Sequence, residues 1–128
     1  MVNEPPLILY VEDNPHNMLL VQRLLRAEGF RVDGASSAEE AETYLKSHKP
    51  NLILMDINLP RIDGYTLTAK FKKLRGLESV PIIALTANAL KGDEDKSFAA
   101  GCNGYIQKPI DVDTLPELIR GFLENAEA

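Results

Sequence analysis

The sequence has 128 residues, of which 45% are hydrophobic and 26% charged, the balance of one ordinary globular domain with a single core. Its formal net charge of −5 disfavours direct binding to nucleic acids or to anionic membranes. No apolar run approaches the roughly 20 residues that a membrane-spanning helix needs, so we expect no membrane insertion. The single cysteine, Cys102, excludes an internal disulfide, which fits a cytoplasmic protein.

Five short apolar runs along the chain predict five β-strands. Three of these runs are almost continuous in Leu, Ile and Val, as is typical of strands that are covered on both faces in a parallel sheet. The predicted strands are residues 7–11, 31–35, 52–55, 82–85 and 105–106.

Segments with helical spacing of apolar residues separate and follow these strands. In the last segment, Pro116 suits the first turn of a helix if Asp113 is its N-cap. The expected apolar face of that helix consists of Leu115, Leu118, Ile119 and Phe122. In an earlier segment we interpret three lysines as a solvated helix face, namely Lys70, Lys72 and Lys73.

Local signals mark where several helices begin and end. Asn14 before Pro15 indicates an N-cap followed by proline at the first helical position. Ser37 with Glu40 three residues later is typical of a capping box. Glycines stand where three helices should stop, at Gly29, Gly76 and Gly101.

The alternation of strands and helices predicts an α/β fold, with a doubly wound five-stranded parallel sheet and helices on both faces. In such sheets ligands bind beyond the carboxyl ends of the strands. Five polar residues from four of the strand ends can converge on one pocket, namely Glu12 and Asp13 after the first strand, Asp56 after the third, Thr86 after the fourth and Lys108 after the fifth.

This set of side chains is suited to phosphoryl transfer. Three crowded carboxylates repel one another, and a hard divalent cation such as Mg²⁺ relieves that repulsion. A carboxylate beside the cation can attack a phosphoryl group and form an acyl phosphate. Lys108 would supply positive charge, and Thr86 a hydroxyl donor, to the oxygens of the transferring group.

Four segments in the same order resemble the receiver domains of two-component response regulators, the CheY-like superfamily. Residues 85–94 are most similar to single-domain regulators of the DivK type and to the receivers of hybrid histidine kinases. The resemblance implies a flavodoxin-like sheet with the strand order 2-1-3-4-5. The matching segments are Tyr10-Val11-Glu12-Asp13-Asn14, Leu54 to Pro60 with Asp63-Gly64, Ala84-Leu85-Thr86-Ala87 and Lys108-Pro109-Ile110-Asp111.

The resemblance also implies a role for each site residue. Asp56 is the expected phosphorylation site, and Mg²⁺, with Mn²⁺ as a substitute, is the expected cofactor. The implied metal ligands are Asp13, Asp56, the backbone carbonyl of Asn58 and, through water, Glu12. The implied catalytic and switch residues are Lys108, Thr86 and Tyr105, and the residues expected to tune dephosphorylation are Asn58 and Asn88.

The expected partners are a histidine kinase or histidine phosphotransferase, and a downstream protein that binds the face of the fourth helix, fifth strand and fifth helix. We expect a regulatory domain that catalyses only its own phosphorylation and dephosphorylation, not an enzyme. It should span residues 1–128, with a core of about 6–124 and no output domain.

Three alternatives remain open from the sequence. A phosphohydrolase like the haloacid dehalogenases would carry Asp-x-Asp after its first strand, whereas here Asn58 stands two residues beyond Asp56, after the third. A flavin-binding module would need a phosphate-cradling loop where Glu12 and Asp13 would repel phosphate. A degenerate receiver would act only as a binding adaptor, and the intact set of acids, Thr86 and Lys108 argues against it.

Overall fold

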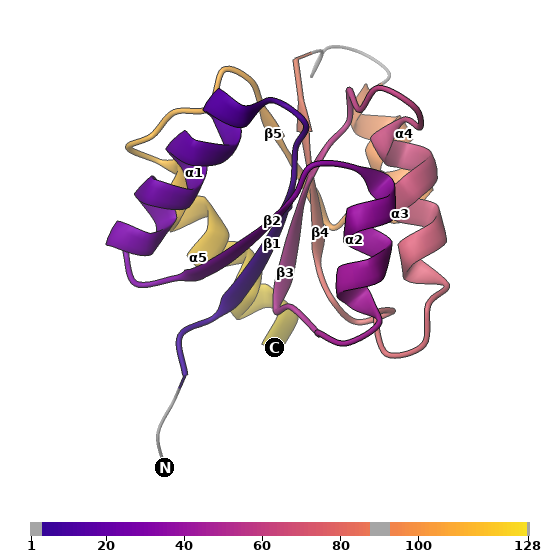
Figure 1. The fold of residues 1–128 in the computed structure, drawn as a ribbon, viewed down its shortest axis with the longest axis horizontal. Coiled ribbons are helices and arrows are strands. Elements are labelled where there is room, and N and C mark those ends of the chain that lie inside the picture. Colours follow the sequence, from indigo (N-terminus) through magenta and orange to yellow (C-terminus); the bar gives the residue numbers. More distant parts are fainter. Residues whose placement is uncertain (1–3, 88–92, 128) are drawn as a thin grey trace.

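The computed structural model describes residues 4–87 and 93–127 and contains a five-stranded parallel sheet with strand order β2-β1-β3-β4-β5 (Figure 1). The predicted fold class and strand order are therefore confirmed. Three strands extend further than the apolar runs alone indicated, because β3 includes Asp56, β4 includes Thr86, and β5 includes Gly104 and Gln107. The strands are β1 (Leu7–Val11), β2 (Arg31–Ala35), β3 (Leu52–Asp56), β4 (Ile82–Thr86) and β5 (Gly104–Gln107).

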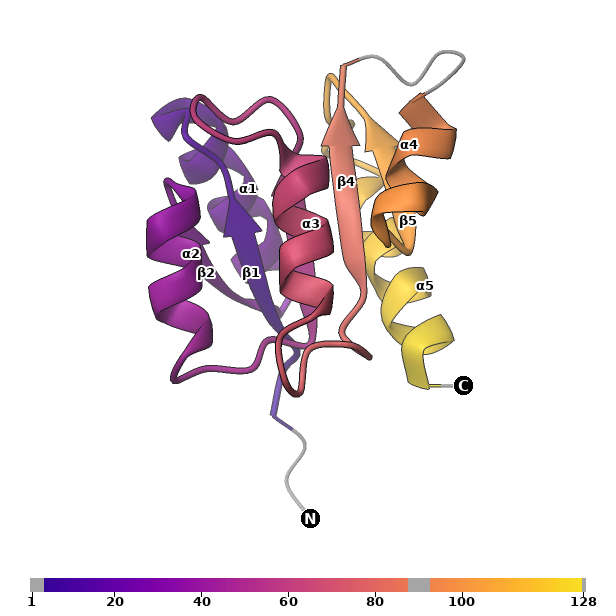
Figure 2. The same cartoon turned by 90° about the vertical axis from the view of Figure 1, so that its right-hand side faces the viewer.

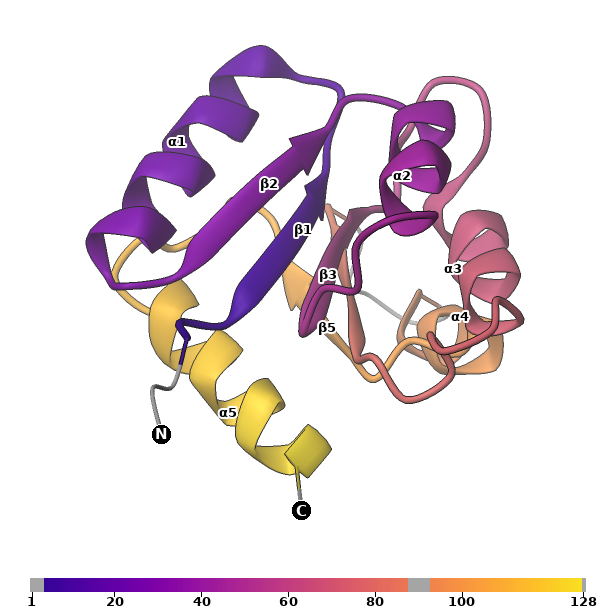
Figure 3. The ribbon, with the colours of Figure 1, turned by 60° about the horizontal axis from the view of Figure 1, so that its bottom comes forward.

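Helices cover both faces of the sheet, as Figures 1 and 3 show. The helices are α1 (Pro15–Ala27), α2 (Ala38–Leu45), α3 (Gly64–Lys72), α4 (Asp93–Ala100) and α5 (Leu115–Glu127). Helices α1 and α5 share one face and bury Val21, Leu25, Leu115 and Ile119 against it. Helices α2, α3 and α4 lie on the other face, where the core includes Ala41, Leu67 and Phe71. Within the described residues, no helix has the length and apolar character that crossing a membrane requires.

The predicted helix boundaries depend on local hydrogen bonds that the structure shows. The Asn14 side chain accepts hydrogen bonds from two backbone N–H groups of the first turn of α1, and Pro15 is the first helical residue. Ser37 caps α2 through Glu40 N, but the Glu40 carboxylate binds Ser36, so only half of the expected capping box forms. The glycines predicted to end three helices all have a positive φ, namely Gly29 (94°), Gly76 (87°) and Gly101 (105°).

Two expectations about side-chain exposure were wrong. Leu118 was expected on the buried face of α5 but is 42% exposed, although Pro116 does lie in the first helical turn. Lys72 was interpreted as part of a solvated face, yet its Nζ donates to Val80 O (2.7 Å) and to Asn103 Oδ1 (2.9 Å). The ammonium of Lys72 therefore ties α3 to the segments before β4 and β5, an arrangement that helical spacing cannot predict.

The carboxyl ends of all five strands lie at the same edge of the sheet because every strand pair is parallel. The arrowheads of β1 and β4 point the same way in Figure 2. Polar residues that end or follow these strands are therefore gathered at one edge, as the sequence predicts.

Candidate functional site

Three carboxylates converge at the carboxyl ends of β1 and β3. The register of β1 and β3 pairs Tyr10 with Leu54. Two residues further along both strands, Glu12 lies beside Asp56 on the same face of the sheet. One carboxylate oxygen from each of Glu12, Asp13 and Asp56 lies within 4.8 Å of the other two. Glu12 and Asp56 are each only 2% exposed, whereas Asp13 is exposed. The cluster therefore has two buried acids and one that faces solvent.

Lys108 places a cation against the two buried acids. Its Nζ lies 2.8 Å from Asp56 Oδ1 and 3.9 Å from Glu12 Oε1. The Lys108 backbone N–H donates to Thr86 O at 2.7 Å, which ties the end of β5 to the end of β4. The peptide bond that follows, to Pro109, is cis. One ammonium thus balances only part of the charge of three carboxylates.

The Glu12 carboxylate is held by donors from its own strand and from the start of α1. Tyr10 Oη donates to Glu12 Oε1 at 2.9 Å, and Asn17 Nδ2 donates to the same oxygen at 3.2 Å. The Asn14 backbone N–H donates to Oε2 at 3.3 Å. Neither Tyr10 nor Asn17 was predicted as a site residue; the signal for Tyr10 was its position two residues before Glu12, on the same strand face.

The two buried carboxyls differ in proton affinity. Burial, together with the hydrogen bond to Asp56 and repulsion from its charge, raises the pKa of Glu12 to about 7. Burial alone would also raise the pKa of Asp56, but hydrogen bonds with Glu12, Lys108 and the Asn58 N–H outweigh it and lower that pKa below its ordinary value. Without a metal, Glu12 therefore binds a proton more readily than Asp56 does.

Thr86 and Tyr105 lie on the other face of the sheet from Asp56. Thr86 ends β4 and is 1% exposed. The register pairs Ala84 with Tyr105, so Thr86, two residues after Ala84, points to the same face as Tyr105. Tyr105 is half-buried, and its ring meets Phe98 of α4 edge-on at a centroid distance of 6.5 Å.

Of the two asparagines expected to tune dephosphorylation, Asn58 lies at the site. Its backbone N–H donates to Asp56 Oδ1 at 3.0 Å, and its side chain is exposed. Asn88 lies outside the described residues.

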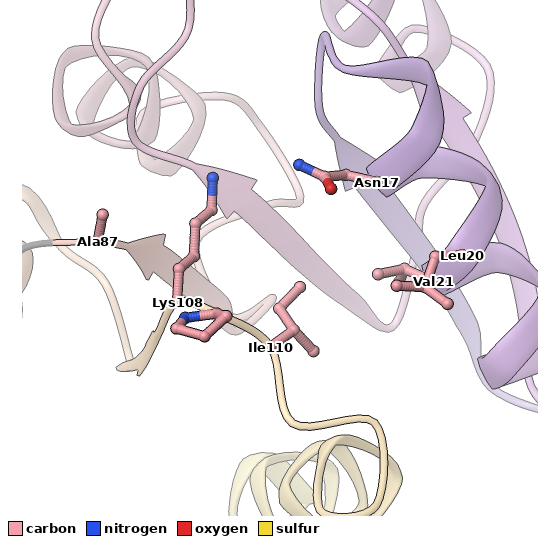
Figure 4. A pocket seen from close by; sticks show the side chains of 7 residues that line it. Asn17, Leu20, Val21, Ala87, Lys108 and Ile110 are labelled. Carbon is pink, nitrogen blue, oxygen red and sulfur yellow. The ribbon is translucent and has the colours of Figure 1, made fainter.

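A pocket of about 420 Å³ opens beside Lys108, between α1 and the segment after β5. Figure 4 shows Lys108 and Asn17 on opposite sides of this pocket, with both side chains directed into the space between them. Its walls are mostly apolar and consist of Asn17, Leu20, Val21, Ala87, Lys108, Pro109 and Ile110.

The donor set fits a hard divalent cation. All three clustered side chains offer carboxylate oxygens, the ligands such cations prefer, and the exposed Asp13 gives an ion access from solvent. Three carboxylates against one nearby ammonium leave an excess of negative charge that a divalent ion would neutralise.

Comparison with known proteins decides the family. The response regulator receiver domain family matches residues 8–120. The chain belongs to this family. It is 40% identical over 122 residues to the polar-differentiation response regulator DivK of Brucella anthropi, covering 95% of this chain and 99% of that protein. It is 41% identical over 119 residues to DivK of Brucella ovis, covering 93% and 97%.

Solved receiver structures share the fold. A response regulator from Chloroflexus aurantiacus superimposes with a TM-score of 0.88 at 31% identity, covering 94% of this receiver and 98% of that chain. The receiver domain of a sensor histidine kinase from Pseudomonas aeruginosa superimposes with a TM-score of 0.85 at 37% identity, with the same coverage. That protein has a magnesium ion coordinated in its active-site cleft. The family assignment leaves no basis for the phosphohydrolase or flavin alternatives.

Proposed function

We propose that this receiver domain accepts a phosphoryl group on Asp56 from the phosphohistidine of a histidine kinase or histidine phosphotransferase, in a Mg²⁺-dependent reaction. The observation that carries the proposal is the position of Asp56, a residue that is 2% exposed and whose carboxylate lies 2.8 Å from Lys108 Nζ beside two further acids. Its depressed pKa keeps it ionised, as a nucleophile must be.

The cation site of this proposal is formed by Asp13, Asp56 and the backbone carbonyl of Asn58, with Glu12 acting through water. The clustered carboxylate oxygens and the magnesium ion of the Pseudomonas receiver support Mg²⁺, and Mn²⁺ is the expected substitute. When bound, the cation supplies positive charge that offsets the negative charge of the phosphoryl oxygens.

The protein's own contribution is to orient the nucleophile and to bind the transferring group. Lys108 Nζ and the Asn58 N–H both bind Asp56 Oδ1, which fixes the orientation of the carboxylate. An Asp56 oxygen forms the new O–P bond as the P–N bond of the donor breaks, and the donor's imidazole nitrogen keeps the electron pair. Lys108 can then pair with a phosphoryl oxygen, which carries more charge than the Asp56 oxygens of the acyl phosphate.

The signal in this proposal passes from the phosphoryl group through Thr86 to Tyr105. Both side chains belong to the same sheet face, and Tyr105 contacts Phe98 of α4. Phe98 is 51% exposed and Leu118 of α5 is 42% exposed, so the face formed by α4, β5 and α5 offers apolar side chains to a downstream protein. Asn58 and Asn88 keep their expected role in tuning dephosphorylation.

In this function the chain acts as a regulatory domain of the cytoplasm and not as an enzyme with a separate substrate. A receiver that acts only as an adaptor is the alternative, and the intact acidic cluster with Lys108 argues against it. A single domain over residues 1–128 also stays a prediction.

The test is phosphorylation of the purified chain by acetyl phosphate or by a phosphorylated histidine kinase. We expect incorporation with Mg²⁺ or Mn²⁺, loss of incorporation with excess chelator and in Asp56→Asn, and no effect of Asp95→Asn, which alters an exposed acid on α4. The product should be labile to base, as an acyl phosphate is. Undiminished labelling in chelator would contradict the metal assignment, and undiminished labelling of Asp56→Asn would contradict the site.

A further inference from the structure

Tyr10 places a hydroxyl group on an otherwise apolar face of β1. The residue is 0% exposed and lies in the core cluster that α1 and α5 cover, next to Ile8 and Leu54 in the sheet. A buried tyrosine hydroxyl needs a hydrogen-bond partner, because leaving it unpaired is costly. The partner here is Glu12 Oε1 at 2.9 Å, so this polar atom of the core is directed at the acidic cluster.

Glu12 Oε1 receives a second hydrogen bond from a different element. Asn17 Nδ2, in the first turn of α1, lies 3.2 Å from this oxygen, while the Asn14 N–H binds Oε2 at 3.3 Å. A glutamate side chain has three rotatable bonds, and donors from both β1 and α1 restrict all of them. The orientation of Glu12 toward Asp56 is therefore set by groups outside the acidic cluster.

We propose that Tyr10 and Asn17 are positioning residues of the metal site, which act by fixing the Glu12 carboxylate. This inference rests on the proposed function, because it assumes that the cluster binds a divalent cation. Hydrogen bonds that orient ligands from behind typically change metal affinity by about 10- to 100-fold when removed. Glu12 acts through water in the proposed site, so we expect the lower end of that range, about tenfold.

Tyr10→Phe tests the inference, because it removes the hydroxyl and keeps the ring. The chain offers a matched control in Tyr44, whose Oη donates to Asp33 Oδ2 at 2.8 Å, a bond of the same kind between α2 and β2. Mg²⁺ titrations followed by amide chemical shifts should give a Kd about tenfold higher for Tyr10→Phe and an unchanged Kd for Tyr44→Phe. A Kd that rises equally in both variants, or in neither, overturns the proposal.

A double-mutant cycle separates positioning from general destabilisation. If Tyr10 acts through Glu12, Tyr10→Phe has no further effect on the Kd in a Glu12→Ala background. A tenfold effect that persists in that background overturns the proposal. Asn17→Ala provides the same test on a half-buried residue of α1, and it carries the test alone if Tyr10→Phe does not fold.

Phosphorylation by acetyl phosphate supplies an independent readout. We expect Tyr10→Phe to need about tenfold more Mg²⁺ for the half-maximal rate and to reach the wild-type rate at saturating Mg²⁺. A lower saturating rate with an unchanged Mg²⁺ requirement contradicts a positioning role toward the metal. If the wild-type protein binds Mg²⁺ and is phosphorylated, and Tyr10→Phe has the same Kd and the same Mg²⁺ requirement, this inference alone is overturned. Wild-type protein that binds no Mg²⁺ overturns the proposed function as well.

Discussion

Asp13 is the exposed acid of the cluster, whereas Glu12 and Asp56 are buried. The exposed Asp13 carboxylate therefore loses little hydration when it binds an ion. Most of the electrostatic attraction between Asp13 and the cation then contributes to the binding affinity. Its charge nevertheless adds to the repulsion within the metal-free cluster, because all three carboxylates lie within 4.8 Å.

Asp13→Asn should therefore have opposite effects on metal binding and on the metal-free fold. We expect the Kd for Mg²⁺ to rise at least about tenfold, since a charged oxygen ligand is lost. Without metal, the free energy of unfolding should increase by about 0.2–1 kcal/mol, the range for exposed charge interactions. Mg²⁺ titrations and thermal melts in chelator measure the two effects, with Glu124→Gln, an exposed acid of α5, as the control. A clearly lower melting midpoint would show that Asp13 is mainly a structural cap.

The connection from β3 to α3 folds back onto the end of β3, beside Asp56. Gly64, the first residue of α3, donates its N–H to Ile57 O at 2.9 Å. A Cβ at this position would lie 2.6 Å from Asp56 O and 2.7 Å from Ile57 Cα, both backbone atoms that cannot move aside alone. The close approach of this loop therefore requires glycine.

Gly64→Ala should destabilise the fold by about 1–3 kcal/mol, the usual cost of overpacking a buried site. The matched control is Gly121→Ala in α5, where an added Cβ has no atom within 4 Å. That change should stabilise the protein by about 0.5–1 kcal/mol, because glycine loses more backbone entropy in a helix than alanine does. Urea unfolding of both variants measures the difference, and equal stabilities would contradict the close contact at Gly64.

In the proposed function, signalling in the whole molecule depends on a connection from Asp56 to the face formed by α4, β5 and α5. Thr86 and Tyr105 share a sheet face, and Tyr105 contacts Phe98 of α4. A phosphoryl group can shift the protein toward an active form only if the two forms bind that charge differently. A charge-assisted hydrogen bond from Thr86 in one form would supply roughly 1–3 kcal/mol, a five- to 150-fold shift in the ratio of forms.

Thr86→Ala should accept phosphate on Asp56 but respond weakly to it, because the hydroxyl that distinguishes the two forms is missing. The measurement is the affinity for a cognate kinase or phosphotransferase, with and without beryllofluoride, in wild type and variant. In the variant, the beryllofluoride-induced change in affinity should shrink by up to the same five- to 150-fold. Equal changes in the two proteins would show that the signal does not pass through Thr86.

The sequence by itself indicated where the five strands lie and the edge of the sheet at which polar residues gather. Buried parallel strands appear as continuous apolar runs, so β1 was predicted with the bounds that the structure has. Local hydrogen bonds made the start of α1 predictable from Asn14 and Pro15. The resemblance to receivers then supplied the strand order, which depends on crossovers that no local pattern contains.

Only the tertiary structure decided which atoms of these residues meet. Lys108 lies 52 residues from Asp56 in the chain, yet their side chains are 2.8 Å apart. The donors to Glu12 come from β1 and α1, and Lys72 reaches Val80 O although its helical position indicated solvent. The periodicity of a helix or strand follows from its backbone geometry, so it determines the face on which each residue lies. The partner of a long polar side chain depends instead on how helices pack on the sheet and on which buried groups need a hydrogen bond.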